Sequence, residues 1–148
     1  YGRGGSPLQN LIVRGIKETK LCAFRCVTAL DAGPIYIKRP LSLTGTAEEI
    51  LLRATLLTEG MIEHIFSERP EPIEQTGEIT KFKRRLPEDG NLASLDDLET
   101  LFDYIRMLDA DGYPPAFIET DCFRLEFNRA TENPNDIVAE VKITRGLP

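Results

Sequence analysis

The clearest hydrophobic pattern in the chain is a helical one that begins near residue 46. Apolar residues recur every three or four positions, which places them on one face of a helix. Thr46 and Glu49 form the S/T-x-x-E pattern of a capping box, which marks the first turn of a helix. The pattern predicts a helix that ends near residue 68 and has an apolar stripe of Ile50, Ala54, Leu57, Met61 and Ile65.

A short helix and two strand-like segments precede this helix. The opening "YGRGGSP" is rich in glycine and predicts a loop, and "PLQNLIVRG" predicts a short helix that ends at Gly15. "KLCAFRCV" and "IYIKRPLSL" are typical of strands, and Asp31 lies in the glycine–proline turn between them. Because proline cannot donate a hydrogen bond to a β-ladder, Pro40 predicts that the second strand lies at an edge or breaks there.

The second half of the chain predicts a connection, a helix and a small sheet. Residues 69–91 are rich in proline, glycine and charge, which is typical of an extended connection. Ser94 and Asp97 are candidate caps for a helix in "LDDLETLFDYIRMLDADG". Alternating apolar and polar residues in "CFRLEFNRA" and "DIVAEVKIT", with "AFIE" before them, predict an antiparallel sheet. We therefore predict a strand–helix part over 1–68, an extended linker over 69–93 and a small α+β unit over 94–148.

Composition predicts a soluble protein whose charge is unevenly placed. With 148 residues, of which 41% are hydrophobic, the chain has the size and core of one ordinary domain. No apolar run approaches the roughly 20 residues that span a bilayer, and no signal segment opens the chain. We therefore expect a cytoplasmic protein with no membrane contact. Residues 1–89 carry 13 Lys and Arg against 12 Asp and Glu, whereas residues 90–148 carry 5 against 12.

The three cysteines and the single histidine do not predict a metal site. Cys22 and Cys26 lie four residues apart in a strand-like segment, so both side chains are expected on the same face, as buried free thiols. His64 lies beside the apolar stripe of the long helix, which favours a surface or half-buried histidine. A zinc site needs more ligands than these residues supply, so we predict no metal.

Four stretches in order resemble the folate-dependent formyltransferase family, which includes methionyl-tRNA formyltransferase and the sugar N-formyltransferases. An Arg-Gly loop precedes a Pro-led helix in "GRGGSPLQNLI", and a strand leads to the Leu-Asp-x-Gly sequence "LDAG" at 30–33. A strand and a Thr-Ala-started helix follow in "PLSLTGTAEEILLRA", and "QTGEITKFKRRLPEDG" comes next. The resemblance covers residues 1–90. It implies an α/β fold, the C-terminal half of a formyltransferase-type Rossmann-like domain, followed by the small α+β unit.

The resemblance also implies a reaction, a cofactor and site residues. The reaction is transfer of a formyl group from 10-formyltetrahydrofolate to a primary amine, which needs a group to manage the proton of the amine. On matching positions Asp31 is the catalytic acid. The backbone of Val27, Thr28, Ala29 and Leu30 would border the pteridine pocket. Arg3 and Gly4 would line the transfer cleft and bind substrate, together with the basic run that contains Lys83, Arg84 and Arg85.

The family pattern also includes an Asn-x-His pair, which lies just upstream of the Arg-Gly loop and so falls before Tyr1. We therefore expect this chain to be part of a longer enzyme, to be inactive alone and to bind folate weakly. The acidic second half repels nucleic acid. We therefore favour a small amine substrate, a nucleotide-linked amino sugar, over methionyl-tRNA. The run "KFKRR" at 81–85 would bind a phosphate or pyrophosphate, or else form a solvated linker.

Two other interpretations stay open at this point. Asp31 is also explained by turn chemistry, because aspartate stabilises tight turns. The acidic unit after residue 90 would also suit a non-catalytic interaction or oligomerisation module, and a homo-oligomer is possible in either case. A formyltransferase relative that has lost its chemistry is a third possibility.

Overall fold

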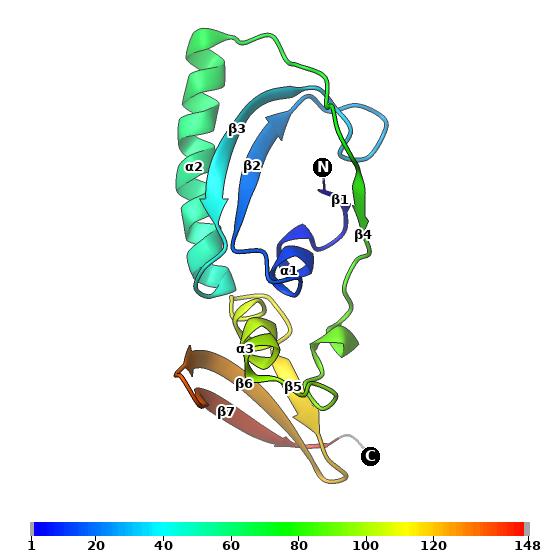
Figure 1. The fold of residues 1–148 in the computed structure, drawn as a ribbon, viewed down its shortest axis with the longest axis vertical. Coiled ribbons are helices and arrows are strands. Elements are labelled where there is room, and N and C mark those ends of the chain that lie inside the picture. Colours follow the sequence, from blue (N-terminus) through cyan, green and yellow to red (C-terminus); the bar gives the residue numbers. More distant parts are fainter. Residues whose placement is uncertain (1, 147–148) are drawn as a thin grey trace.

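The computed structural model describes residues 2–146 and forms an elongated molecule. Figure 1 shows the long helix, two β-ribbons and a short helix in its upper part, and a helix on a small sheet in its lower part. In chain order the elements are β1 Gly2–Gly4, α1 Pro7–Ile12, β2 Glu18–Phe24, β3 Ile35–Ser42, α2 Ala47–Glu68, β4 Thr80–Phe82, the 3₁₀ turn η1 Pro87–Gly90, α3 Leu98–Arg106, β5 Ala116–Glu119, β6 Phe123–Glu132 and β7 Ile137–Arg145. The predicted mixture of helices and strands is confirmed.

The long helix α2 begins where the capping box predicts. The amide of Glu49 donates to Oγ1 of Thr46 (3.2 Å), and the amide of Thr46 donates to the Glu49 carboxylate (2.9 Å). These bonds satisfy amides that have no partner within the helix. α2 packs against β3, which pairs antiparallel with β2, and Ile50 and Met61 are buried on that side. Pro40 lies in this two-stranded ribbon, where both strands are edges.

Residues 69–93 run back along the upper part of the molecule (Figure 1). Ile73 forms an antiparallel bridge with Ile35, and β4 then pairs in parallel with β1, so that Arg3 lies opposite Lys81. The segment therefore joins two parts of the upper region by backbone hydrogen bonds. The proposed division of the chain at residues 68 and 93 stays a prediction.

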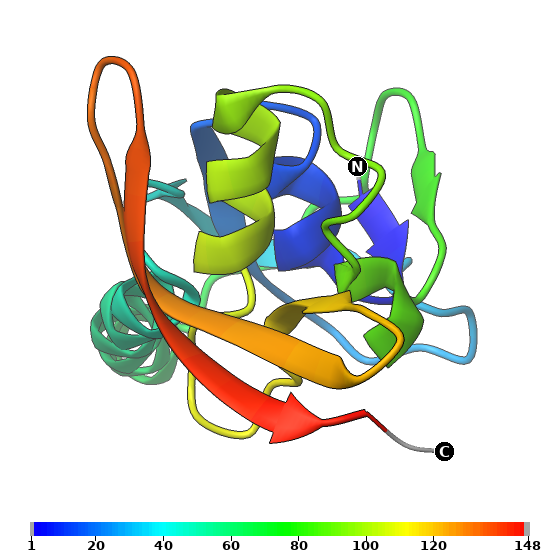
Figure 2. The same cartoon turned by 90° about the horizontal axis from the view of Figure 1, so that it is seen from below.

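The lower part is a three-stranded antiparallel sheet in the order β5–β6–β7 with α3 against one face (Figure 2). Leu92, Ile105 and Ala116 form its buried core. The predicted helix and small sheet are confirmed, although α3 is shorter than the apolar pattern suggests. Asp97 caps α3 by accepting a hydrogen bond from the amide of Thr100 at 2.8 Å.

The end of α3 connects the two parts in a way that the sequence pattern did not predict. Met107 is fully buried in the upper core, beside Ile12 and Leu43. Arg106 is buried too, and its Nη1 donates to the carbonyl oxygens of Leu43 (2.6 Å) and Gly45 (2.9 Å). A buried arginine needs such partners, because an unpaired charge in the interior is costly.

The prediction of buried thiols on one strand face is wrong. β2 ends at Phe24, so Cys26 lies beyond the strand and is exposed, and Cys122 is exposed as well. Cys22 is half-buried. Within residues 2–146, no group of three or more His, Cys, Asp or Glu side chains is placed to hold a metal ion. No helix in the same residues is long and apolar enough to cross a membrane.

Candidate active site

Asp31 lies in a turn whose backbone is tightly fixed. The amide of Arg25 donates to the carbonyl of Pro34 at 2.9 Å and closes the base of the turn. Asp31 itself has φ +52°, in the left-handed region that few non-glycine residues adopt. A Cβ atom on Gly33 would lie 1.7 Å from the carbonyl oxygen of Arg25, so only glycine fits there. This close contact explains in steric terms why the last residue of the Leu-Asp-x-Gly sequence is glycine.

The carboxylate of Asp31 is held by the Arg-Gly loop. The amide of Gly4 donates to Oδ2 of Asp31 at 2.9 Å, across 27 residues of sequence. Gly4 has φ +114°, and an added Cβ would lie 2.3 Å from the carbonyl oxygen of Phe82. The other carboxylate oxygen makes no hydrogen bond to any residue that the structure describes. The acid is therefore fixed at one oxygen and available at the other.

Gln75 joins the turn to the Arg-Gly loop. Its Nε2 donates to the carbonyl oxygens of Asp31 (2.9 Å) and Gly33 (2.8 Å), and its Oε1 accepts from Nη2 of Arg3 (2.9 Å). Gln75 lies in the "QTGE" part of the fourth motif, and no role was predicted for it. No periodic pattern marks it, because the contacts span 42 to 72 residues. Nε of Arg3 is buried and has no hydrogen-bond partner among the described residues.

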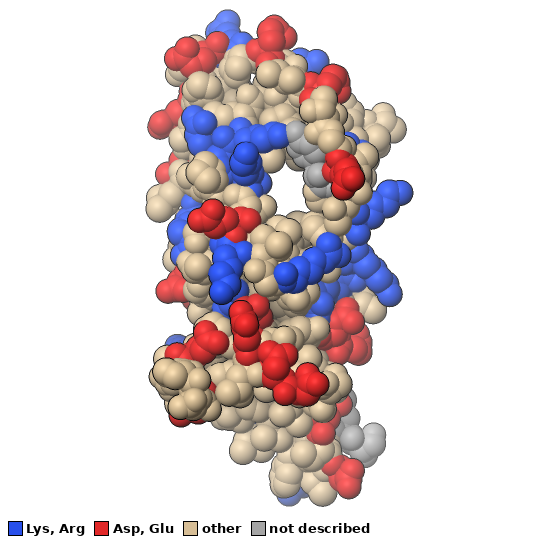
Figure 3. Space-filling model, viewed as in Figure 1, with Lys and Arg blue, Asp and Glu red and all other residues tan. Residues whose placement is uncertain are grey.

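Asp31, Gly4 and Gln75 are among the residues that line a cavity of about 1010 Å³. Figure 3 shows the molecule hollowed in this upper part. The remaining walls come mainly from α1, the β2–β3 ribbon and the first half of α2, and include Leu8, Leu11, Ile35, Leu41, Leu43 and Phe82. Cys22 also lines the cavity, and burial raises the pKa of its thiol against the lowering effect of Lys38 and Lys20. The lining also includes charged residues such as Arg14, Glu18 and Lys20, and the volume is near the upper end of the range of small-molecule sites.

The four residues predicted to border a pteridine, Val27 to Leu30, are exposed, and Leu30 has 73% of its surface accessible. They precede Asp31 in the same turn, but their side chains are not among those that line the large cavity. Their predicted role in cofactor binding stays a prediction.

The predicted substrate-binding residues lie side by side although they are far apart in the sequence. The carbonyl of Lys83 accepts from Nδ2 of Asn10 (2.9 Å), and the amide of Arg85 donates to Oγ of Ser6 (3.1 Å). These bonds hold the basic run against the loop that contains Arg3 and Gly4. The side chains of Lys83 and Arg84 are exposed. The structure therefore brings the Arg-Gly loop, the Asp31 turn and the basic run to one side of the molecule.

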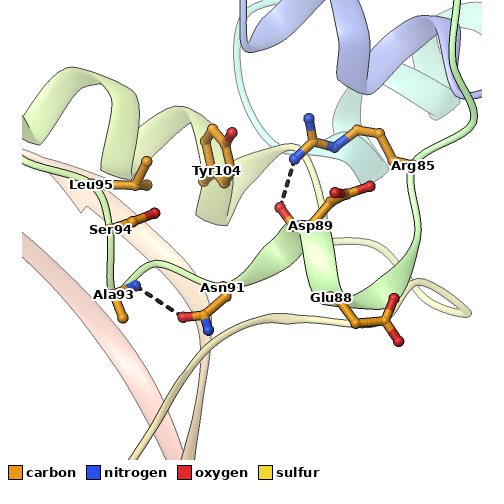
Figure 4. Close-up of a pocket in the computed structure, with 8 residues that line it drawn as sticks. All are labelled: Arg85, Glu88, Asp89, Asn91, Ala93, Ser94, Leu95 and Tyr104. Carbon is orange, nitrogen blue, oxygen red and sulfur yellow. Dashed lines mark hydrogen bonds between the residues drawn. The ribbon is translucent and has the colours of Figure 1, made fainter.

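Arg85 turns away from this group toward a second, smaller pocket of about 460 Å³ (Figure 4). Its guanidinium lies over the ring of Tyr104, 5.0 Å from the centroid, and Nη2 donates to the carbonyl oxygen of Asp89 at 2.6 Å. Glu88 and Asp89 also line this pocket. Arg85 is thus partly committed to internal contacts, whereas the side chains of Lys83 and Arg84 are exposed, and their role in substrate binding stays a prediction.

Comparison with known proteins identifies the family of the chain. Residues 87–144 match the model of a family described as the C-terminal domain of methionyl-tRNA formyltransferase. A solved methionyl-tRNA formyltransferase from Clostridium thermocellum superposes on 98% of the chain with a TM-score of 0.94 and 51% sequence identity. The chain belongs to the formyltransferase family. The resemblance seen in residues 1–90 is confirmed and extends into the second half.

The formyltransferase chain spans only part of its relatives. It covers 64% of the Clostridium structure. A methionyl-tRNA formyltransferase from Gluconobacter oxydans is 27% identical over 135 residues, which are 89% of this chain and 44% of that protein. The chain therefore corresponds to about half to two thirds of these proteins.

A more distant structure, the sugar 3N-formyl transferase WlaRD solved in the presence of dTDP and 5-N-formyl-THF, has a TM-score of 0.53 and 14% identity. The match covers 84% of this chain and 56% of WlaRD, and it shows a shared fold alone. The sequence-based preference for an amino sugar as the acceptor is therefore not supported.

Proposed function

We propose that this formyltransferase chain is the substrate-facing part of an enzyme that transfers a formyl group to the amino group of methionyl-tRNA. The observation that carries the proposal is a fixed carboxylate, Asp31, which lines the large cavity and is bound by the Arg-Gly loop, beside which the exposed basic run lies. The 51% identity to the Clostridium methionyl-tRNA formyltransferase supports this acceptor.

The cavity fits the formyl donor that the family implies. About 1010 Å³ with several apolar side chains in its lining gives room for a fused ring, and Asp31, Gly4 and Gln75 add polar groups to that lining. 10-Formyltetrahydrofolate would supply the formyl group when bound. The buried Nε of Arg3 is a donor that a polar group of a ligand could satisfy.

Asp31 would act on the proton of the acceptor amine. When the amine nitrogen takes over the formyl group, it would lose a proton, and the folate nitrogen whose bond to the formyl carbon breaks would gain one. A nearby carboxylate can accept the first proton, directly or through water, and return it to that leaving nitrogen. The bond from the Gly4 amide leaves one carboxylate oxygen for this task. Gln75 has no proton to exchange, and its three hydrogen bonds would keep the Asp31 turn in place.

The distribution of charge also agrees with a nucleic-acid substrate. Figure 3 shows Lys and Arg grouped on the upper part of the molecule and a band of Asp and Glu near α3. The negative net charge of residues 90–148 disfavoured RNA as a substrate, but a net charge summed over a whole segment does not describe the surface near the site. Phosphate contacts depend on local surface charge, and Lys83 and Arg84 supply it beside the Arg-Gly loop.

The test measures formylation by the full-length protein that contains this chain. Methionyl-tRNA and a nucleotide-linked amino sugar would be compared as acceptors, with 10-formyltetrahydrofolate as the donor. We expect formylation of methionyl-tRNA. Formylation of the sugar alone would reject the proposed acceptor, and formylation of neither would reject the reaction.

A charge variant tests the role of the basic run. Lys83→Ala combined with Arg84→Ala should raise KM for tRNA and lower its dependence on salt, with a smaller change in kcat, because two phosphate contacts are lost. Lys17→Ala combined with Arg39→Ala removes the same charge from other exposed positions and is the matched control. Equal effects from the two variants would reject the assignment of the basic run.

A further inference from the structure

The two edges of the lower sheet differ. At the β5 edge, the amide of Leu92 donates to the carbonyl oxygen of Phe117 at 2.8 Å, and Asn91 forms a parallel bridge with Phe117. At the β7 edge, no strand within residues 2–146 pairs with the outer side of β7. One edge is therefore covered by the chain itself, and the other presents free backbone donors and acceptors.

β7 is neither short nor interrupted by proline, although it carries charged side chains, which can also protect an edge. It has nine residues, IVAEVKITR, with no proline. The only register shift in the β6–β7 pair lies between Asn128 and Thr131 of β6. Val138, Val141 and Ile143 have 62%, 44% and 62% of their surface accessible. A long, regular edge with exposed apolar side chains is suited to pairing with another strand.

The charges on β7 indicate which strand would pair there. We propose that β7 pairs antiparallel with β7 of a second copy of this chain, with the two-fold axis at Val141. In this register Glu140 lies opposite the second copy's Lys142, and Lys142 lies opposite the second copy's Glu140. Directly opposed residues share one face of a sheet and have Cβ atoms about 5 Å apart, so both pairs can form ion pairs.

The same register extends a charge pattern that each copy already has. Within one copy, Lys142 pairs with Glu126 (3.5 Å) and Arg129 pairs with Glu140 (3.2 Å). Across the axis the charges would alternate in the order Glu126, Lys142, Glu140, Arg129, where the last two belong to the second copy. Each charged side chain in this series across the strands would therefore lie next to side chains of opposite charge.

Neighbouring registers are unfavourable. Side chains alternate between the two faces, and directly opposed residues of the two copies must lie on the same face. The two-fold axis therefore always passes through a residue position, and the nearest other registers have it one residue to either side. With the axis at Glu140, the two copies of Glu140 would lie directly opposite each other, and with the axis at Lys142 the two copies of Lys142 would do so. Like charges that lie directly opposite each other destabilise a sheet. The sequence around Val141 therefore disfavours the registers one residue to either side, and among these three only the axis at Val141 forms the two Glu140–Lys142 pairs.

On the other face, the pairing would place apolar side chains together. Val141 would lie opposite Val141 of the second copy, and Ala139 would lie opposite Ile143. These residues share a face with Leu125 and Phe127, which lie on the neighbouring strand β6 and on the side of the core beneath α3. The result is a continuous six-stranded sheet with both α3 helices on the same side.

The test measures sedimentation velocity of the full-length protein that contains this chain, over a range of protein concentrations. We expect a reversible dimer. Glu140→Lys and Lys142→Glu should each weaken it about tenfold or more, because each places like charges opposite one another twice per dimer. An equal mixture of the two variants should form a heterodimer, because one variant carries lysine at both positions and the other carries glutamate at both. A general folding defect would not be rescued by mixing.

Two further variants complete the experiment. Glu140→Lys combined with Lys142→Glu in one chain exchanges the charges and should keep the dimer. Glu63→Lys changes the net charge equally at an exposed position on α2 and should have no effect. Circular dichroism checks that each variant is folded. A wild-type protein that stays monomeric overturns the proposal, as does a single variant that dimerises normally or a mixture that forms no heterodimer.

Discussion

The region around Asp31 and the lower unit of the molecule are held together by different forces. Around Asp31, hydrogen bonds from Gly4 and Gln75 join segments that lie 27 to 44 residues apart, beside a cavity of about 1010 Å³. In the lower unit, α3 and consecutive antiparallel strands enclose an apolar core. Polar contacts therefore define positions at the site, whereas apolar packing defines the shape of the lower unit.

The difference predicts which substitutions affect function and which affect stability. A change at the site that keeps the hydrogen bonds should alter the reaction and leave the fold intact. A change where the two regions meet should alter the free energy of unfolding instead. The following variants test this separation.

Asp31→Asn should have the largest effect on activity. The amide oxygen can still accept from Gly4, but the side chain no longer accepts a proton, so kcat/KM should fall by about 10²–10⁴-fold. The melting temperature should hardly change. Asp111→Asn, in an exposed turn, is the matched control. Undiminished formyl transfer to methionyl-tRNA by the full-length Asp31→Asn protein would remove Asp31 from the mechanism.

Arg106→Leu should have the largest effect on stability. It leaves the largely buried Asp103 carboxylate and the carbonyls of Leu43 and Gly45 without their partner, at a cost of about 3–5 kcal/mol of unfolding free energy. Urea denaturation measures this loss. Adding Asp103→Ala should cost less than the sum of the single changes, because the unpaired charge is then absent. A loss under about 1 kcal/mol for Arg106→Leu would contradict the buried-pair account.

Gly33→Ala should damage both fold and activity, because a Cβ would meet the carbonyl oxygen of Arg25. Forced overpacking of this kind costs about 1–3 kcal/mol. Gly60→Ala is the contrasting variant, since an added Cβ there meets open space within α2. It should stabilise the protein by roughly 0.5–1 kcal/mol. Thermal denaturation of the pair checks the sign of both changes, and a neutral Gly33→Ala would mean that the turn can adjust.

Gln75→Ala should lower kcat by about ten- to a hundredfold with little change in melting temperature, because the Asp31 turn loses its alignment. Amide exchange at Gly4 should become faster if the loop and turn loosen together. Glu74→Ala, at the exposed neighbouring position, should leave kcat and the amide exchange rate at Gly4 unchanged. An unaltered exchange rate at Gly4 would show that Gln75 does not couple the two segments.

Asp97→Ala should have the smallest effect. The amide of Thr100 holds the pKa of Asp97 below its usual value, so the carboxylate stabilises α3 above the unfolded-state pKa. This contribution is lost as pH falls through the lower, folded-state pKa. The melting temperature should therefore drop slightly at neutral pH, and the difference from wild type should shrink in acid. A difference that is independent of pH would show that the charge is not involved.

The sequence predicted elements well where local signals determine them. Thr46 and Glu49 located the start of α2, Asp97 capped α3, and alternation located β6 and β7. It failed where structure depends on distant contacts. Arg106 is a charged residue that pairs with Asp103 on the same helix, but its burial also depends on the carbonyls of Leu43 and Gly45, which lie 63 and 61 residues away.

For the candidate site, the roles that the sequence suggested for individual residues stay predictions, and the structure shows only how those residues are arranged. The ordered motifs selected Asp31, Arg3 and Gly4, and the structure brings them together. They gave no role to Gln75, because its importance lies in three hydrogen bonds that no local pattern encodes. Averaged charge led to the unsupported amino-sugar preference, since it hides where Lys83 and Arg84 lie.

The insertion of Met107 into the upper core has a consequence for how the protein folds and evolves. Its neighbours Ile12, Leu41 and Leu43 lie much earlier in the chain, so this core closes only after most of the chain is synthesised. The two regions should therefore unfold in one cooperative transition. If recombination replaced the lower unit by one from another protein, the new unit would need a side chain at this position that packs against Ile12, Leu41 and Leu43. This requirement restricts which units can be exchanged.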